Sequence, residues 1–288
     1  MSSGAASGEI DVRVEMARPR VGLMRVLPTL LTALAFIVPM RAEDAPKASQ
    51  WNGYDRLDFK VADHAALLVK PKSPADGRPW IWRTEFFGHE PQADIALLAA
   101  GWHVAFFQVS DMYGAPPAIA LMAQFHDAVV RDYALNPRAT LEGLSRGGLY
   151  AVNFAAAHPA HAAALYLDAP VLDIRSWPGG KGAGPGDKRC WQQALAIYGL
   201  TEETAPAFKG NPLDLLAPLA KAGIPILSVC GDADKTVPFA ENTVLMEQRY
   251  KALGGKIEVI AKPGVDHHPH SLKDPRPIVD FLLKNALK

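Results

Sequence analysis

Gly143-Leu144-Ser145-Arg146-Gly147 decides the fold of this 288-residue chain, because the segment matches the pattern Gly-x-Ser-x-Gly. A short strand pattern at 140–144 precedes the serine, and an alanine-rich helical pattern at 147–158 follows it. In that setting a sharp turn from strand to helix lifts the serine hydroxyl above the edge of a sheet. Glycines permit such a turn because they carry no Cβ that would collide with the neighbouring backbone. The segment therefore predicts a strand–turn–helix unit that presents Ser145 as a nucleophile.

Strand-like and helix-like patterns alternate on both sides of this turn. Strands are predicted at 54–61, 65–69, 79–83, 102–109, 140–144, 163–167, 224–230 and 256–260. Helices are predicted at 91–100, 116–133, 147–158, 190–198, 240–253 and 277–286. Such alternation is typical of a mostly parallel central sheet that is flanked by helices on both faces. After the sixth strand, a lid-like insertion at about 173–220 exceeds the length of an ordinary connection.

The composition excludes several classes of protein. Hydrophobic residues make up 49% of the chain and charged residues 21%, which excludes wholesale disorder. Two cysteines are too few for a disulfide scaffold or for a four-cysteine zinc site. The 30 basic and 30 acidic residues cancel, and a dedicated nucleic-acid binder would need a basic face. The sequence thus predicts no nucleic-acid partner.

The first 42 residues differ from the rest of the chain. The stretch Val26–Met40 is apolar and uncharged, lies between two arginines, and is shorter than the roughly 20 residues of a membrane span. A basic start followed by a short apolar run indicates a signal peptide, with cleavage expected after Ala42 or Ala45. We therefore expect a secreted or periplasmic protein with no stable membrane span after cleavage.

Two further expectations follow from that leader. Met24 would make a compact signal-peptide start, so residues 1–23 are predicted to be a spurious extension and 43–288 the catalytic domain. An exported protein also permits Cys190 and Cys230 to pair, although spacing in the sequence does not decide whether they do.

A serine nucleophile needs a base and an orienting acid, and two later segments offer them. The segment 231–238, GDADKTVP, follows the predicted strand at 224–230. The segment 264–270, GVDHHPH, follows the strand at 256–260. Both come just after the carboxyl end of a predicted strand, where open α/β sheets place their sites.

In combination, these motifs resemble the α/β-hydrolase family of serine esterases over about residues 54–288. The resemblance implies the α/β-hydrolase fold and nucleophilic acyl transfer without a cofactor. The family pattern Gly-x-x-Asp-x-x-Val-Pro implies Asp234 as the triad acid. Asp232 and Asp168 are the alternatives, since some relatives place the acid after the preceding strand.

The histidine loop implies His267 as the base, with His268 and His270 as alternatives. Asp266 occupies the position that usually holds glycine in this family. Three histidines in four residues would also suit a metal cluster. No matching cysteine or second spaced histidine pair accompanies them, so no metal is predicted.

Acyl transfer also requires two N–H groups that bind the developing oxyanion. The first is expected from the backbone of Arg146, directly after the nucleophile. The second is expected from Arg83 or Thr84, in the loop after the third predicted strand, where the His-Gly that is usual in the family is absent.

Three features point to carbohydrate esters as substrates, the first being the predicted export. Gly-Leu-Ser-Arg-Gly-Gly resembles the Gly-x-Ser-Arg-x-Gly motif of glucuronoyl esterases and related uronate methyl-esterases, which implies that Arg146 helps to stabilise the oxyanion. Leu144 departs from the cysteine that glucuronoyl esterases usually have there. In the insertion, Arg175 and Trp177 provide a cation and an aromatic face that suit a sugar ring with a carboxylate. The expected substrate is a small-molecule or polysaccharide ester.

Two other functions stay open. A serine peptidase of the prolyl-oligopeptidase type shares this sheet, but it would carry a preceding propeller domain, and only a few dozen residues precede the first predicted strand. A catalytically silent binding module on the same fold would not need serine, aspartate and histidine in the catalytic order.

Overall fold

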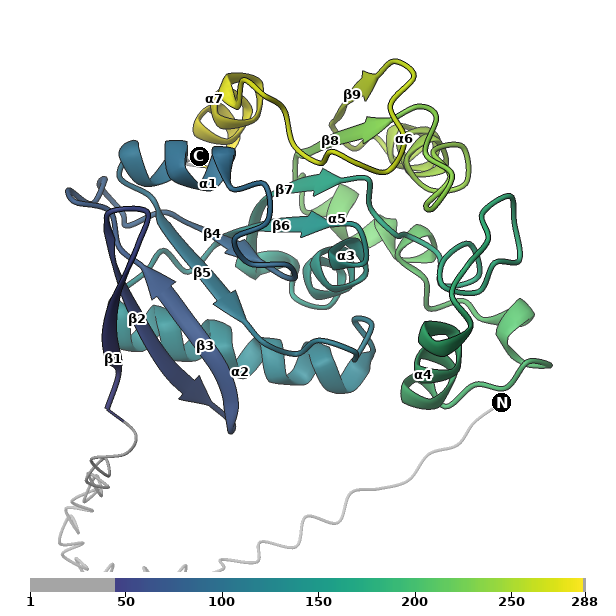
Figure 1. Cartoon of the computed structure of the whole chain (residues 1–288), viewed down its shortest axis with the longest axis horizontal. Helices are drawn as coiled ribbons and strands as arrows, with labels where there is room; N and C mark the ends of the chain where they lie inside the picture. The colour runs from purple at the N-terminus through teal and green to yellow at the C-terminus, as the bar shows by residue number, and fades with distance from the viewer. Residues whose placement is uncertain (1–44, 287–288) are drawn as a thin grey trace, which may run out of the picture. The chain divides into compact units, whose positions relative to one another are not determined.

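Nine strands form a single sheet in the computed structural model, which describes residues 45–286 (Figure 1). Across the sheet they lie in the order β1-β2-β3-β5-β4-β6-β7-β8-β9. Strands β1 to β3 are antiparallel, β3 pairs antiparallel with β5, and every later pair is parallel. The strands are β1 (Lys47–Trp51), β2 (Tyr54–Val61), β3 (His64–Val69), β4 (Trp80–Arg83), β5 (His103–Phe107), β6 (Ala139–Leu144), β7 (Ala162–Asp168), β8 (Ile226–Gly231) and β9 (Ile257–Lys262).

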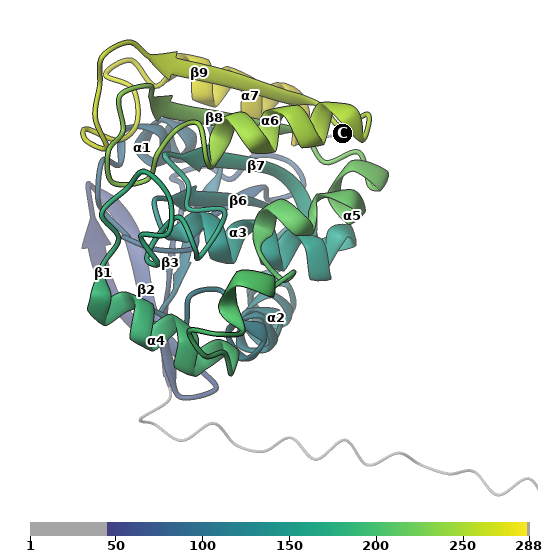
Figure 2. The same cartoon turned by 90° about the vertical axis from the view of Figure 1, so that its right-hand side faces the viewer.

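Helices cover both faces of this sheet. They are α1 (Gln92–Ala99), α2 (Pro116–Tyr133), α3 (Gly147–Ala157), α4 (Lys188–Tyr198), α5 (Leu216–Lys221), α6 (Thr243–Ala252) and α7 (Arg276–Asn285). Helices α1 and α7 pack on one face, and α2, α3, α5 and α6 pack on the other. Figure 2 shows α3, α5 and α6 in front of the parallel strands and α7 behind them. The central strands β4, β6, β7 and β8 are thus buried between two helical layers, as their apolar sequences predict.

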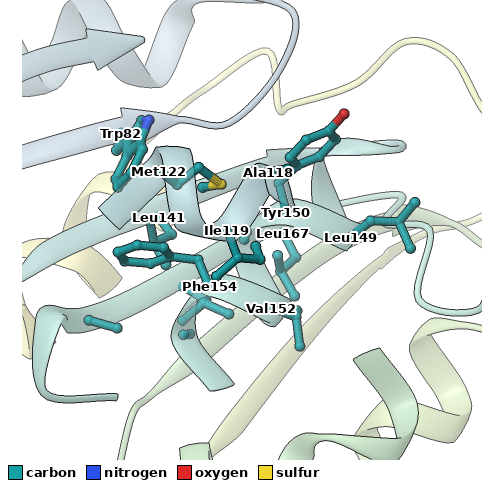
Figure 3. Packing of buried hydrophobic residues seen from close by; sticks show 14 of the residues in the cluster. Trp82, Ala118, Ile119, Met122, Leu141, Leu149, Tyr150, Val152, Phe154 and Leu167 are labelled. Atoms are coloured by element: carbon teal, nitrogen blue, oxygen red, sulfur yellow. The ribbon is translucent and has the colours of Figure 1, made fainter. Parts of the chain in front are cut away.

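Strand β4 illustrates how the sequence fills both layers. Its side chains alternate between faces, because successive residues of a strand point in opposite directions. Trp80 and Trp82 join the core beneath α2 and α3, whereas Ile81 joins the core beneath α1 and α7. The Trp82 ring lies 5.0 Å from the ring of Phe154 on α3, edge to face (Figure 3). Four consecutive buried residues therefore anchor the strand that leads into the candidate site.

The structure confirms the eight predicted strands and adds β1. The sequence of β1, KASQW, is exposed over four residues and has no apolar alternation, so only its backbone pairing with β2 defines it as a strand. Between β7 and β8 the chain passes through an irregular segment at 169–187, then α4 and α5. The short helix α5 was not predicted from the sequence.

Other expectations meet the structure in different ways. The predicted signal peptide, residues 1–42, lies outside the described residues. Within the part of the chain that is described, no helix has both the length and the hydropathy that a bilayer crossing requires. Cys190 is half-buried and Cys230 is buried, and both are free thiols, so they do not pair.

Acid is expected to destabilise the fold through His103, which is buried in β5. Burial lowers the pKa of His103 from 6.5 to about 4, outweighing its hydrogen bond to the Pro79 carbonyl. Between these two values the unfolded chain binds a proton that the folded chain does not, so stability falls as the pH drops. We expect His103 to cost about 2–3 kcal/mol of unfolding free energy by pH 4.

Urea unfolding at pH 7 and pH 4.5 measures this effect. The variant His103→Asn, which does not titrate there, should lose less stability over the same interval than the wild type. Equal losses in the two proteins would show that His103 does not cause the acid sensitivity.

Candidate active site

Ser145 occupies the sharp turn between β6 and α3. Its backbone has a φ of +49°, a left-handed conformation that non-glycine residues adopt rarely and at an energetic cost. Two backbone hydrogen bonds hold it there: the Ser145 N–H donates to the Asp168 carbonyl (2.8 Å), and the Ser145 carbonyl accepts from the Val171 N–H (2.8 Å). The strained turn is therefore stabilised by the last residue of β7 and by the segment that follows it.

The glycines around Ser145 allow this turn to be tight. A Cβ on Gly143 would lie 2.8 Å from the Gly147 carbonyl oxygen, and one on Gly148 would lie 2.7 Å from the Cβ of Pro170. Such contacts are too close for any side chain. The small residues around Ser145 are thus explained by close backbone approach.

Ser145, His267 and Asp234 form one hydrogen-bonded chain. The Ser145 Oγ lies 3.0 Å from the His267 Nε2, and the His267 Nδ1 lies 2.6 Å from the Asp234 Oδ2. An ionised aspartate only accepts, so the His267 Nδ1 carries the proton and the Nε2 accepts from the serine hydroxyl. The second oxygen of Asp234 accepts from the backbone N–H groups of Thr236 and Val237 at 2.9 and 2.8 Å. The three residues thus lie in the arrangement that a nucleophile, a base and an orienting acid require.

Side-chain oxygens that accept from backbone N–H groups join the loop after β8, residues 232–238, to the loop after β9, residues 263–270. The Asp266 Oδ1 accepts from the N–H groups of Lys235 (2.9 Å) and His267 (2.8 Å), which lower the pKa of Asp266. Asp266, in the position of the usual glycine, therefore fixes the backbone of His267. Asp232, the alternative acid, accepts from the Gly264 N–H at 2.6 Å and so braces the two loops.

The remaining alternatives lie beside the triad and take no part in its hydrogen bonds. Asp168 is fully buried and pairs with His270, whose Nδ1 lies 2.7 Å from the Asp168 Oδ1. The other oxygen of Asp168 accepts from the Tyr166 hydroxyl and the Ser271 N–H, both at 2.8 Å. His268 is exposed, and its ring centroid lies 5.0 Å from that of His267.

The pairing of β4 with its neighbours bears on the predicted second oxyanion donor, Arg83 or Thr84. Arg83 lies inside β4, in register with Phe106 and Glu142, and the Thr84 N–H already donates to the Glu142 carbonyl at 3.0 Å. The N–H groups of Arg146 and Glu85 take part in none of the backbone–backbone hydrogen bonds that join the turns and loops of residues 45–286. The Glu85 nitrogen lies 3.7 Å from where a Cβ on Gly147 would be, so it borders the turn at Ser145. Sequence reasoning missed Glu85 because it could not tell which N–H the strand pairing consumes.

The side chain of Arg83 instead belongs to a buried ion-pair network. Its Nε lies 2.9 Å from the Asp94 Oδ2, and its Nη2 lies 2.9 Å from the Glu142 Oε1. Burial alone would lower the pKa of Arg83, but these two carboxylates raise it above its ordinary value. The Nη1 donates to the carbonyls of Phe86 (2.8 Å) and His89 (2.7 Å). Arg83 thus holds the loop after β4 in place.

The guanidinium of Arg146 is held beside the nucleophile by its surroundings. It donates to the Asp111 Oδ1 at 2.8 Å and to the Glu85 Oε2 at 3.4 Å. Its central carbon lies 5.4 Å from the centre of the Phe86 ring and 5.8 Å from that of Tyr113. Burial raises the pKa of Glu85, and Arg146 partly opposes that rise.

The predicted substrate residues of the insertion do not lie together at the triad. Arg175 lines a cavity of about 420 Å³ whose lining includes none of Ser145, Asp234 and His267. Its guanidinium is paired with Asp173 at 2.6 Å, and its role in substrate binding stays a prediction. Trp177 packs against Tyr113, with ring centroids 6.4 Å apart.

Solved structures place this architecture among known proteins. The sequence matches no protein-family model and no curated protein. Dipeptidyl peptidase 4 from Porphyromonas gingivalis superposes with a TM-score of 0.63 at 17% identity, over 82% of this chain and 36% of that one. Acylaminoacyl peptidase from Pyrococcus horikoshii superposes with a TM-score of 0.60 at 15% identity, over 85% of this chain and 42% of that one. A puromycin-hydrolyzing peptidase from Mycobacterium tuberculosis superposes with a TM-score of 0.58 at 15% identity, over 85% of this chain and 39% of that one.

These likenesses confirm the predicted α/β-hydrolase fold. At such low identity they show the fold alone. The chain spans about two-fifths of the length of the proteins that it superposes on.

Proposed function

We propose that this chain is a serine hydrolase that cleaves acyl compounds through a covalent acyl-enzyme. The hydrogen-bonded chain from Ser145 through His267 to Asp234 carries the proposal. The three residues follow one another in the catalytic order, and each hydrogen bond runs from serine to histidine to aspartate. This arrangement suits a serine that loses its proton to a histidine held by a buried carboxylate.

The reaction proceeds in two acyl transfers. The Ser145 Oγ attacks the substrate carbonyl as the His267 Nε2 accepts the serine proton, and the Asp234 carboxylate stabilises the imidazolium that forms. The N–H groups of Arg146 and Glu85 donate to the oxyanion of the tetrahedral intermediate. His267 then protonates the leaving group, and a water molecule repeats the sequence to release the acid and restore Ser145.

Amides of short peptides are the substrates that we favour. The proteins with the superposable fold are named as peptidases: dipeptidyl, acylaminoacyl and puromycin-hydrolyzing. The free guanidinium that a uronate ester would require is also missing at Arg175, which Asp173 neutralises. A carbohydrate ester is the second candidate, favoured by the position of Arg146 directly after the nucleophile.

Two measurements test the proposal. A fluorophosphonate probe should label the wild type covalently and leave Ser145→Ala unlabelled; a folded wild type that is not labelled would contradict a serine hydrolase. Peptidyl aminomethylcoumarin amides, a methyl glucuronate ester and acetylated sugars then define the substrate class. We expect the highest kcat/KM with an amide, and turnover of the uronate or sugar esters alone would establish the esterase instead.

A further inference from the structure

We propose that His89, His268 and His270 form a zinc site beside the candidate active site. One nitrogen from each ring can be chosen so that all three lie within 4.8 Å of one another. His89 follows β4, whereas the other two residues follow β9, so two distant loops supply the ligands. Three imidazoles with a vacant fourth position form a coordination set that Zn²⁺ favours.

His270 is oriented as a metal ligand. Its Nδ1 lies 2.7 Å from the Asp168 Oδ1, so in the neutral imidazole the Nδ1 donates to that carboxylate and the Nε2 is the nitrogen that can bind a cation. Histidines that bind metals commonly donate their other ring N–H to a carboxylate, which fixes the ring and increases its basicity. Asp168 is itself fixed by Tyr166 and Ser271. The proposed reaction does not use this buried pair of Asp168 and His270. A role of His270 as a metal ligand would explain why the pair is present.

The other two imidazoles can close around an ion. Tetrahedral zinc with bonds of about 2.0–2.1 Å brings ligand nitrogens to roughly 3.4 Å from one another. His89 and His268 are exposed, so their rings can rotate to reach that spacing. The backbone of His89 is anchored, since its N–H donates to the Phe86 carbonyl at 3.1 Å and its own carbonyl accepts from Arg83 at 2.7 Å.

The site is adjacent to the catalytic base and separate from it. Both nitrogens of His267 are engaged, with Ser145 and with Asp234. The His267 ring centroid nevertheless lies 5.0 Å from that of His268 and 4.9 Å from that of His270. A dication there would disfavour the imidazolium that forms on His267, so bound zinc should slow hydrolysis. This consequence rests on the proposed function, whereas zinc binding itself does not.

A second cluster, His126, Asp127 and His161, serves as an internal comparison. The His126 Nε2 already lies 2.9 Å from the Pro137 carbonyl, and the Asp127 side chain is 70% exposed. No buried carboxylate orients a ligand there, so we expect tight binding at the first cluster only.

Zinc titration of the untagged, metal-free full chain tests the site, with calorimetry as the readout. The wild type should bind one tight Zn²⁺. His89→Ala and His268→Ala, which change exposed side chains, should weaken binding at least tenfold, and Asp168→Asn by 10–100-fold. His161→Ala should bind like the wild type, and His267→Ala should retain the tight site.

Several outcomes would overturn the proposal. The first is a wild type that binds zinc no more tightly than His89→Ala does. The second is loss of the tight site in His161→Ala. The third is loss of the tight site in His267→Ala, which would place the ion on the catalytic base. Cobalt(II) provides a second readout, because a four-coordinate site should give visible absorption bands that His89→Ala lacks. Zinc should also lower kcat in the wild type and not in His89→Ala, whose zinc-free activity should be unchanged. Fluorophosphonate labelling of the metal-free protein tests the hydrolase function separately.

Discussion

Replacing Asp234 with Asn should lower kcat by about four orders of magnitude while the protein stays folded. The carboxylate accepts the His267 Nδ1 proton at 2.6 Å, which keeps the Nε2 available as an acceptor for the Ser145 hydroxyl. An asparagine amide would reverse that arrangement by donating to Nδ1, and the Nε2 would then carry the proton. Stopped-flow or steady-state kinetics on the preferred acyl substrate measure the effect. Circular dichroism checks that the variant is folded.

Asp232→Asn is the matched control for that variant. Asp232 lies two residues away and its side chain accepts from the Gly264 backbone N–H rather than from His267, so its replacement should change kcat by a few-fold at most. A loss of kcat in Asp232→Asn that exceeds the loss in Asp234→Asn would refute the assignment of the acid.

Replacing Arg83 with Met should destabilise the fold by about 3–5 kcal/mol. The Arg83 side chain is 1% exposed, and its two partners, Asp94 and Glu142, are 0% and 1% exposed. Removing the cation leaves two buried carboxylates without a counter-charge, and it also removes the hydrogen bonds to the loop after β4. Urea unfolding at pH 7 measures the loss as a shift of the midpoint.

Two comparisons isolate the buried charge as the cause. Arg131→Met breaks an ion pair with Asp132 in which the side chains are 71% and 50% exposed, and it should cost about 1 kcal/mol or less. Combining Arg83→Met with Asp94→Asn and Glu142→Gln should recover part of the lost stability. If Arg83→Met cost no more than Arg131→Met, burial would not be what makes this network important.

Much of the candidate site was predictable because its chemistry lies in short motifs at strand ends. Ser145 sits in a pattern that is typical of a tight strand-to-helix turn, and Asp234 and His267 each follow a predicted strand within a few residues. Strand ends share one edge of a parallel sheet, so such motifs meet whatever the details of packing. The strands were likewise predictable, except β1, whose exposed side chains carry no apolar pattern.

The failures have a common physical cause. The second oxyanion donor depends on which N–H groups the pairing of β4 with β6 consumes, and no local pattern records that pairing. The meeting of His89 with His268 and His270 joins loops about 180 residues apart in the chain.

The sequence by itself determined the fold class, the candidate nucleophile and the order of its two candidate partners, because backbone sterics and strand burial leave local signatures. Only the tertiary structure decided which neighbouring charges are already paired, which backbone donors remain free and which histidines share one space. Those properties depend on contacts between segments that the sheet brings together, and electrostatic and hydrogen-bonding partners are set by distance in space.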